Sequence, residues 1–556
     1  MSPPQWLLEL RIDGRVERFS TQPAVVIADG VALQFREGLA DLAFTLAAIE
    51  AGGEVSVPLQ IDAAALEAIR LERDGVVAGG WAALVASFHE IEGAVGTLYR
   101  WTPGTDLGAA RVMLRGFAEE VEHGGPLEPL VFTLRRLLFA GSRPILAPTA
   151  RVDDSTSPYS AAANIHFDAK IGGQSYPRVY GYPGVSPISL PFVGKRPYAV
   201  VPGLLSHYRS TVGGPGLVVI ADGPVEASNV WVFDYSGDLF LNDLLAVIEV
   251  DDELGRTISV VNLGAPLSSL AGDPGHPYYL GFALGYGGGR LRRDRSGALR
   301  GMGEIIADLL AENARLDVIE VDARLDAWFV DTFTNEAGVD SWDWISRELG
   351  PLAPFRLFEG RLGLAVRLMD WRAVPADAVA RFDVDLGQLD RVSTLRSSSA
   401  STVANRVIVE YGPDRQTGAF LKLVGIAADT DAADPRIVGS LRCSESQRRL
   451  ARPEQGDDGV REVVIQSSHT WDQGTARLIA TYKAAELAAP HGLIEYRGEP
   501  GLEQRLDPTD PIVVNDTEVG LINRVALVDS ITVAANETRV ALIVLPNPST
   551  TERATL

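Results

Sequence analysis

The stretch from Val460 to Leu545 constrains the fold most, because its pattern reads strand, helix, strand, tight acidic loop, strand, strand. Asp472 stands at a helix N-cap position, good helix formers follow at 475–489, and Pro490 ends the run. Apolar runs on either side predict four strands, at 463–465, 493–496, 525–533 and 539–545. This end of the chain is therefore predicted to be a mixed region in which sheet dominates.

The first 145 residues are typical of antiparallel sheet. Leu8, Leu10 and Ile12 alternate with polar residues, and Asp13-Gly14 is a type I′ turn signal that returns the chain into a second strand. Several short strands separated by turns indicate a barrel or a sandwich over residues 1–145, with 226–300 as a candidate completion. The other elements predicted in this part are strands at 25–27, 54–59, 90–100 and 110–117 and a short helix at 63–71.

Proline marks the next segment. Eleven of the 33 prolines lie between 142 and 225, and each removes a hydrogen-bond donor from a β-ladder. Residues 146–225 are too apolar for a flexible linker, so we interpret them as an inserted domain or as an arm packed on a neighbouring chain. Strands return at 230–235 and 257–263, residues 242–250 are helix or strand, and the glycine-rich basic loop 286–295 is a candidate domain boundary.

Residues 301–400 are predicted to form a helical and hairpin accessory domain. An apolar stripe over 305–310 predicts one helix, a stripe of Leu325, Trp328 and Phe329 predicts a second, and Ser341 is a candidate cap for a third. The run 355–368 is typical of a hairpin that turns at Glu359-Gly360.

A second β domain is predicted over residues 401–546. Its first strand is 406–412, in which Val407, Val409 and Tyr411 alternate with the residues between them. Residues 547–556 are expected to be a frayed tail.

The charge and the single cysteine exclude some classes of function. A net charge of −23 argues against wrapping nucleic acid, which needs clustered Lys and Arg, although DNA could slide through an acidic channel without adhering. Cys443 cannot form an intrachain disulfide or a cysteine-based metal site. Neither a signal peptide nor a window of about 18 apolar residues is visible, so we expect cytoplasmic synthesis and no stable membrane association.

The residue types that could carry chemistry do not form recognisable motifs. The sequence has no His-Glu-x-x-His helix and no Gly-x-Ser-x-Gly elbow, so we expect no catalytic, cofactor-binding or metal-binding residues. The glycine-rich loop 285–290 lacks the Gly-Lys-Ser/Thr ending of a phosphate-binding loop. The candidates for such roles are the histidines His89, His123, His166, His207, His276, His469 and His491, the acidic groups Asp251-Asp252-Glu253, Asp153-Asp154 and Asp370, and the tryptophans Trp328, Trp342, Trp344 and Trp371.

For each candidate the ordinary interpretation is a structural one. The histidines are expected to be surface or hydrogen-bonded residues, and the acidic groups to be solvated turns. The four tryptophans could stack on sugar rings, but they are expected to fill the core of the helical domain. The lone cysteine is expected to be a small buried or surface thiol.

The run Gly498-Glu-Pro-Gly501-Leu-Glu, then Leu506-Asp-Pro-Thr-Asp510-Pro-Ile-Val-Val-Asn-Asp516, then Val519-Gly520-Leu-Ile-Asn-Arg-Val525 carries a family resemblance. It resembles the C-terminal barrel domain of phage tail hub proteins, which occur in baseplates and tail tips. The resemblance covers residues 300–545 best, and 1–145 fits as the first barrel. It implies an α+β, β-rich fold with two tube-like antiparallel β-barrel domains plus inserted and helical accessory domains.

The resemblance also implies a function and partners. A homotrimer would sit at the distal end of the tail tube, bind a distal tail or tube protein above and a fibre or spike below, and contact the tape-measure protein. Three chains with two barrels each could match a sixfold tube, because each chain offers two equivalent faces. DNA would only pass through the channel, and the chain would be a virion protein assembled in the host cytoplasm, without enzymatic activity. Two alternatives stay open: a virion-associated enzyme that degrades cell wall or glycan, and a secreted carbohydrate-binding protein.

Overall fold

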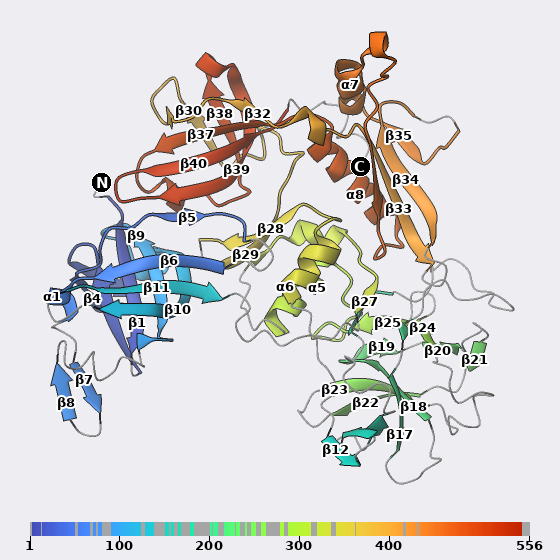
Figure 1. Cartoon of the computed structure of the whole chain (residues 1–556), viewed down its shortest axis with the longest axis horizontal. Helices are drawn as coiled ribbons and strands as arrows, with labels where there is room; N and C mark the ends of the chain where they lie inside the picture. The colour runs from blue at the N-terminus through green and yellow to red at the C-terminus, as the bar shows by residue number, and fades with distance from the viewer. Residues whose placement is uncertain are drawn as a thin grey trace.

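The computed structural model describes residues 3–546 with gaps (Figure 1). The residues outside the description are 13, 50–53, 67–69, 74–75, 80–90, 124–127, 138–150, 155–156, 161–164, 168–177, 183–200, 203, 209–215, 228–229, 234–238, 242–245, 252–256, 263–278, 283–286, 313–319, 335–340, 362, 415–418, 431–432 and both ends of the chain, 1–2 and 547–556. The predicted frayed tail therefore lies outside the described residues.

The N-terminal part forms an eight-stranded sheet in the order β3-β4-β2-β1-β9-β10-β11-β6. Its strands are β1 (Gln5–Ile12), β2 (Arg15–Ser20), β3 (Ala24–Ala28), β4 (Val31–Glu37), β6 (Glu54–Ile61), β9 (Val95–Trp101), β10 (Arg111–His123) and β11 (Leu130–Leu137). The predicted alternation in β1 is confirmed, because Leu8, Leu10 and Ile12 are buried. All eight strands come from residues 5–137, and the described strands between 226 and 300 pair elsewhere.

Backbone contacts of the residues just after β4 join one side of this sheet to its edge strand β6. Leu39, just after β4, forms an isolated bridge with Ile61 of β6. The Leu39 N–H donates to the Ser20 carbonyl on β2 at 3.0 Å, and the Ala40 N–H donates to the Gln60 carbonyl at 3.0 Å. The sheet is thus curled, with β2 and β6 linked through residues 39–40.

The C-terminal part forms a second large sheet, in the order β30-β38-β39-β40-β37-β31 with two short additions. Its strands are β30 (Ala380–Asp383), β31 (Asp390–Arg391), β37 (Gly492–Gly498), β38 (Pro511–Asp516), β39 (Leu521–Val533) and β40 (Thr538–Val544), with β32 (Arg396–Ser397) on β37 and β5 (Phe44–Leu46) on β39. Figure 1 shows the blue and red sheets side by side. One apolar cluster contains side chains of both sheets, including Trp6 and Leu98 from the first and Tyr496 and Ile531 from the second.

Between β32 and β37 the chain builds a separate four-stranded sheet covered by helices. The order is β35 (Ile437–Gly439), β34 (Ala419–Ala427), β33 (Arg406–Asp414) and β36 (Glu462–Gln466). The helices are α7 (Leu441–Leu450) and α8 (Gln473–Leu487). The predicted cap of α8 is confirmed, since the Asp472 carboxylate accepts the Thr475 N–H at 2.7 Å. Val409 and Tyr411 share an apolar cluster with Ile479 of α8.

A helical module packs between the sheets. It contains α5 (Met302–Glu312), β26 (Glu320–Val321), a 3-10 turn (Ala323–Ala327), α6 (Ser341–Trp344) continued by a π turn (Ile345–Leu349), and the hairpin β28 (Phe355–Glu359) and β29 (Leu364–Leu368). The stripe of α5 and the hairpin are confirmed. The second predicted helix is wrong: Asp322 caps only a 3-10 turn, which ends at Ala327 before Trp328 adopts extended backbone.

The described residues between 151 and 334 contribute smaller sheets. One has the order β12 (Arg151–Asp154), β13 (Ser157–Ser160), β14 (Ile165–Phe167), β17 (Leu204–Tyr208), β18 (Gly216–Ala221), β23 (Thr257–Asn262), β22 (Ala246–Asp251). The other sheets pair β16 (Val201–Pro202), β24 (Tyr279–Phe282), β20 (Val230–Phe233) and β21 (Leu239–Leu241), then β15 (Arg178–Tyr180) with β27 (Thr332–Thr334), and β19 (Val225–Ala227) with β25 (Gly287–Arg290). The ambiguous run 242–250 contains strand from Ala246 onward.

Two further differences from the sequence predictions concern pairing. The candidate helix 63–71 is cut to α1 (Ala63–Leu66), because β7 (Arg70–Arg73) pairs with β8 (Val76–Gly79) and tertiary pairing overrides helix propensity. The range 401–546 contains strands of two sheets, since β33–β36 and β37–β40 do not pair with one another. Among the described residues, no helix combines the length and apolar character that crossing a bilayer requires.

Candidate functional site

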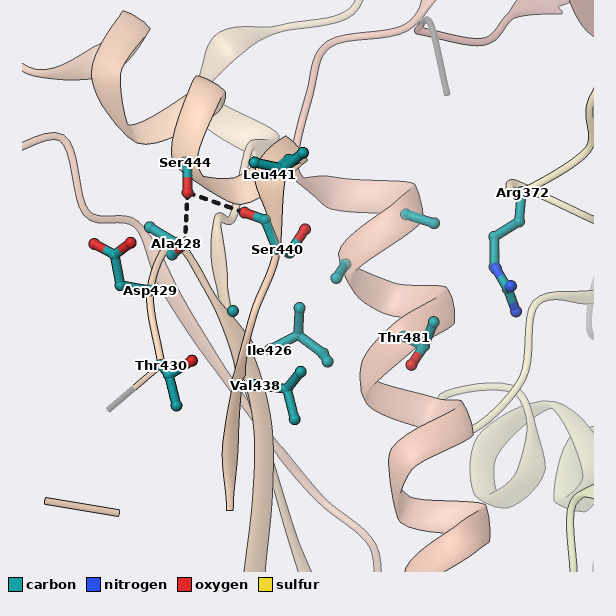
Figure 2. A pocket seen from close by; sticks show the side chains of 13 residues that line it. Arg372, Ile426, Ala428, Asp429, Thr430, Val438, Ser440, Leu441, Ser444 and Thr481 are labelled. Carbon is teal, nitrogen blue, oxygen red and sulfur yellow. Dashed lines mark hydrogen bonds between the residues drawn. The ribbon is translucent and has the colours of Figure 1, made fainter. Parts of the chain in front are cut away.

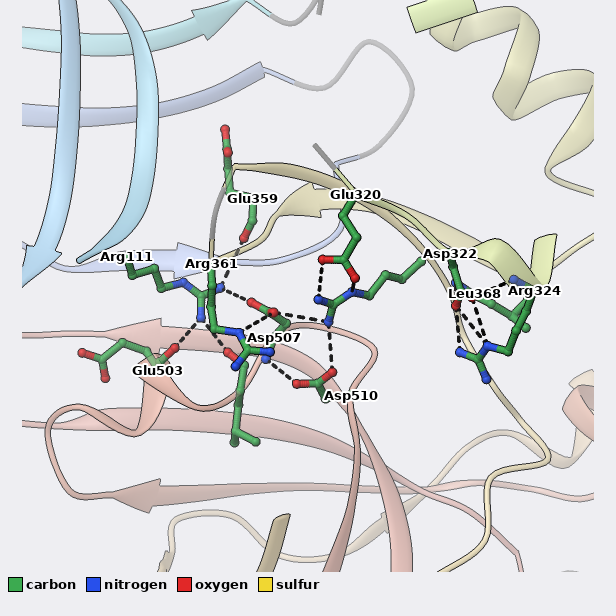
Figure 3. Close-up of polar contacts among 12 residues, drawn as sticks. Arg111, Glu320, Asp322, Arg324, Glu359, Arg361, Leu368, Glu503, Asp507 and Asp510 are labelled. Carbon is green, nitrogen blue, oxygen red and sulfur yellow. Dashed lines mark hydrogen bonds and ion pairs between the residues drawn. The ribbon is translucent and has the colours of Figure 1, made fainter. Parts of the chain in front are cut away.

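The polar centre of the molecule lies where the two large sheets meet the β28–β29 hairpin (Figure 3). The loop between β37 and β38, residues 499–510, supplies Glu503, Asp507 and Asp510. The first sheet supplies Arg100 and Arg111, and the hairpin region supplies the other groups, Glu359, Arg361 and Arg367. We call these eight residues the junction cluster. It joins segments that lie up to about four hundred positions apart in the sequence.

Arg111 is the most enclosed cation of the junction cluster, with a fully buried side chain. Its guanidinium donates to the Asp507 carboxylate at 2.7 Å, to the Leu506 carbonyl at 2.6 Å, to the Glu359 carbonyl at 3.2 Å, and to the Glu503 carbonyl. Burial lowers the pKa of Arg111, while the charge of Asp507 acts in the opposite direction. One guanidinium from β10 thus fixes two chain segments that belong to other parts of the fold.

Three arginine side chains contact the Asp507 carboxylate. Besides Arg111, Arg361 lies 3.0 Å and Arg367 3.2 Å from its carboxylate, which is itself fully buried. Arg367 also contacts Asp510 at 3.1 Å, and Asp510 accepts the backbone N–H of Asp507 at 2.8 Å. Burial raises the pKa of Asp510 to about 6, and the nearby Asp507 charge adds to this effect.

A second buried pair continues the junction cluster. Arg100 of β9 lies 3.3 Å from Glu503, and both side chains are almost completely buried. Glu503 also accepts the Thr538 hydroxyl at 2.7 Å, which ties it to β40. The Arg100 guanidinium carbon lies 4.7 Å from the centre of the Trp6 ring. The charges of the junction cluster are turned toward one another, an arrangement suited to fixing segments together rather than to presenting a reactive group.

A small cavity lies elsewhere, between α8 and the β34–β35 edge (Figure 2). It holds about 350 Å³ and has mainly apolar walls, including Ile426, Val438 and Ala484. At its rim Ser444 of α7 donates to the carbonyls of Ser440 and Ala428. The first contact lies within the start of α7, and the second ties α7 to the residue that follows β34.

One histidine is placed in a defined polar network. The Nε2 of His469 lies 2.7 Å from the Glu348 carboxylate, and its Nδ1 lies 2.7 Å from the Thr332 hydroxyl. The hydrogen bond to His469 lowers the pKa of Glu348 to about 2. The network connects the π turn after α6 to the loop before α8, and it matches the expectation of a hydrogen-bonded histidine.

The other sequence candidates fall into three groups. All four tryptophans are at least nine-tenths buried. Trp328, Trp342 and Trp344 lie in the apolar cluster of the helical module, as expected, whereas Trp371 packs in a separate cluster with residues of the second large sheet. His491 is partly buried and stacks on Trp371, Asp370 pairs with Arg324 at 2.8 Å, and Cys443 is buried. The candidates that lie outside the described residues, or whose side chains do, are His89, His123, His166, His207, His276, Asp153, Asp154, Asp251, Asp252 and Glu253.

The sequence pattern does not predict the junction cluster. The acidic loop at 506–510 is visible in the sequence, but its arginine partners are distant in sequence and charged residues are usually exposed. Over the described part of the chain, no group of three or more His, Cys, Asp or Glu side chains is arranged to hold a metal ion.

No family model matches the chain, and no curated protein matches it. Solved structures do. The tail protein from Neisseria meningitidis MC58 has a TM-score of 0.40 and 9% identity, with 97% of this chain and 96% of that chain covered. The solved structures to which this chain is similar thus include proteins described as tail proteins.

Two further neighbours extend this finding. The 43 kDa tail protein of prophage MuSo2 from Shewanella oneidensis has a TM-score of 0.35 and 10% identity, with 95% of this chain and 99% of that chain covered. A chain in the virion of a native gene transfer agent particle has a TM-score of 0.40 and 13% identity, with 74% of this chain and 90% of that chain covered.

Proposed function

We propose that this chain is the structural subunit of a phage-type tail hub. It assembles as a homotrimer at the distal end of the tail tube, joins the tube or distal ring to a central fibre or spike, and gates the DNA channel. The observation that carries the proposal is the pair of large curled sheets in one chain, which share one apolar cluster. Three copies would offer six such sheets to a sixfold tube.

Closure of each sheet into a barrel is part of the proposal. For the first sheet, the support is the Leu39–Ile61 bridge, which joins the chain just after β4 to the edge strand β6. In the second sheet the outermost strands, β30 and β31, follow each other in the chain with only residues 384–389 between them. The Val384 N–H donates to the Asn515 carbonyl at 2.8 Å, which holds the start of this connection against β38.

The junction cluster holds the two large sheets of one chain rigidly together, as a ring subunit requires. Buried arginines paired with buried carboxylates fix relative orientation, because a shifted geometry would leave a charge unpaired in an apolar surrounding. The net charge of −23 suits a lumen through which DNA slides without adhering.

We expect the purified chain to be a trimer at micromolar concentration in neutral buffer. Multi-angle light scattering on a gel-filtration column measures the molar mass directly, and three times 59.6 kDa is the expected value. A constant mass of one chain over the accessible concentration range would contradict the trimeric hub. If purified chain cleared a turbid suspension of peptidoglycan, the alternative of a virion-associated enzyme would replace this proposal.

A further inference from the structure

The turn that carries Asp507 and Asp510 contains a residue in an unfavourable backbone conformation. The Asp510 N–H donates to the Asp507 carbonyl at 3.2 Å, which closes a four-residue turn with Pro508 and Thr509 at its centre. Thr509 has a φ of 75°. Proline at the second position and positive φ at the third are features of a type II turn, whose third residue is usually glycine. We call residues 507–510 the junction turn.

Threonine is an unfavourable residue at the third position of this turn. The left-handed region of backbone conformation crowds a side chain, and a side chain branched at Cβ is crowded most. Thr509 is also buried, with 3% of its surface exposed. The junction turn is therefore strained, and the contacts around it must hold it in place. The other non-glycine residues with positive φ in the described chain are not β-branched; they are Asp29, Glu120, Arg295 and Asn523.

Backbone hydrogen bonds join the junction turn to β39 of the second sheet. The Thr509 N–H donates to the Val528 carbonyl at 2.7 Å, and the Val528 N–H donates to the Asp510 carbonyl at 3.0 Å. These bonds lie where the register between β39 and β40 shifts, between Val528 and Ser530. Because both bonds use the backbone of the strained turn, protection of the Val528 amide reports whether the turn is closed.

Arginines of the β28–β29 hairpin contact the carboxylates of the junction turn (Figure 3). Arg367 lies 3.1 Å from Asp510 and 3.2 Å from Asp507. Arg361 lies 3.0 Å from Asp507 and is 44% exposed, whereas Arg111, from the first sheet, is fully buried. An ion pair in contact with water exchanges readily for hydrogen bonds to solvent. We therefore expect the contacts on the hairpin side of the turn to separate first.

We propose that the junction turn is a strained latch between the β28–β29 hairpin and the second sheet. In the closed state, the ion pairs hold Thr509 in its unfavourable conformation. In the open state, Arg361 and Arg367 leave the carboxylates and the turn relaxes, while Arg111 keeps its contact from the first sheet. Such a two-state element lets the hairpin move against the second sheet without unfolding of either. The inference concerns a single chain and does not depend on the proposed trimer.

Hydrogen–deuterium exchange of the full chain, followed by mass spectrometry, tests the latch at the Val528 amide. Thr509→Gly removes the strain of the closed state, because glycine populates positive φ readily. Exchange at Val528 is expected to slow by about fivefold or more. Thr509→Val keeps a branched side chain in the same conformation, so it is the matched control for strain and is expected to exchange at the native rate.

Weakening the ion pairs is expected to have the opposite effect. Arg367→Met leaves Asp510 without its arginine, so exchange at Val528 should become faster by about tenfold. Adding Thr509→Gly to this variant is expected to cancel much of that increase, because the strain and the ion pair act on the same opening. Arg461→Met is the control for loss of an arginine, since Arg461 pairs with Asp457 at 2.6 Å outside the junction cluster. It should leave exchange at Val528 unchanged.

Amides of α8, such as those of Ile479 and Ala480, provide the reference for unfolding of the whole chain. The latch predicts that Thr509→Gly slows exchange at Val528 and leaves these amides at their native rates. Slowing of both by the same factor would show that the turn acts only on global unfolding, and would overturn the latch. Unchanged exchange at Val528 in Thr509→Gly, or equal slowing in Thr509→Val, would show that backbone strain does not drive the opening, and either result overturns it as well.

Discussion

Replacing Arg111 with methionine is expected to lower the free energy of unfolding by about 3–5 kcal/mol. Methionine fills much of the same space, so the loss comes mainly from the groups left behind. Asp507 keeps Arg361 and Arg367 but loses its closest arginine, at 2.7 Å. The carbonyls of Leu506 and Glu359 lose a buried donor as well. Urea denaturation followed by tryptophan fluorescence measures the free energy of unfolding of the native chain and of the variant, for the transition in which the junction cluster separates.

The control for this variant is Arg324→Met. Arg324 also pairs with two carboxylates, Asp322 and Asp370, but its side chain is 55% exposed. An ion pair in contact with water contributes about 1 kcal/mol or less, because solvent screens it and competes for its hydrogen bonds. Equal losses in the two variants would show that Arg111 acts as an ordinary surface cation, and would contradict the role given to the junction cluster.

The local elements of the C-terminal part could be predicted because their signals are local. Asp472 before a run of helix formers defines the start of α8, and Pro490 stands just after its end. The alternation of Val407, Val409 and Tyr411 predicts a strand, since every second side chain must face the same side. Each of these patterns depends on residues within a few positions of one another.

The partners of those strands could not be predicted from alternation. Period-two patterning says that 406–412 and 493–496 are strands, but not that they enter different sheets. Likewise the short strand β5 leaves the N-terminal part to pair with β39, through Thr45 opposite Thr532. Such pairings depend on how loops close over long distances, for which the sequence carries only weak signals.

The junction cluster shows the same limit at the level of the site. Arg111 lies in a strand pattern and would be read as a solvent-facing residue, because arginine is rarely buried without a partner. Its partners Leu506 and Asp507 lie nearly four hundred residues away. A buried pair of this kind becomes visible only when the two sheets are placed together.

Asp510 is expected to make the stability of the junction depend on pH. Burial raises its pKa to about 6 from an ordinary value of 3.8. Between these values the folded chain holds a proton that the unfolded chain has already released. The contribution of Asp510 to the free energy of unfolding is therefore fully present below about pH 4. It is lost as the pH rises to about 6, and the whole loss amounts to about 3 kcal/mol.

The Asp510→Asn variant isolates this contribution. The amide oxygen can still accept the Asp507 N–H, but the side chain no longer titrates. The difference in unfolding free energy, native minus variant, is expected to be larger at pH 4.5 than at pH 7.5, because only the native chain is destabilised as Asp510 ionises. The control Asp385→Asn changes an exposed carboxylate and should follow the native profile. Parallel profiles for the native chain and Asp510→Asn would mean that Asp510 ionises in the junction as readily as in the unfolded chain.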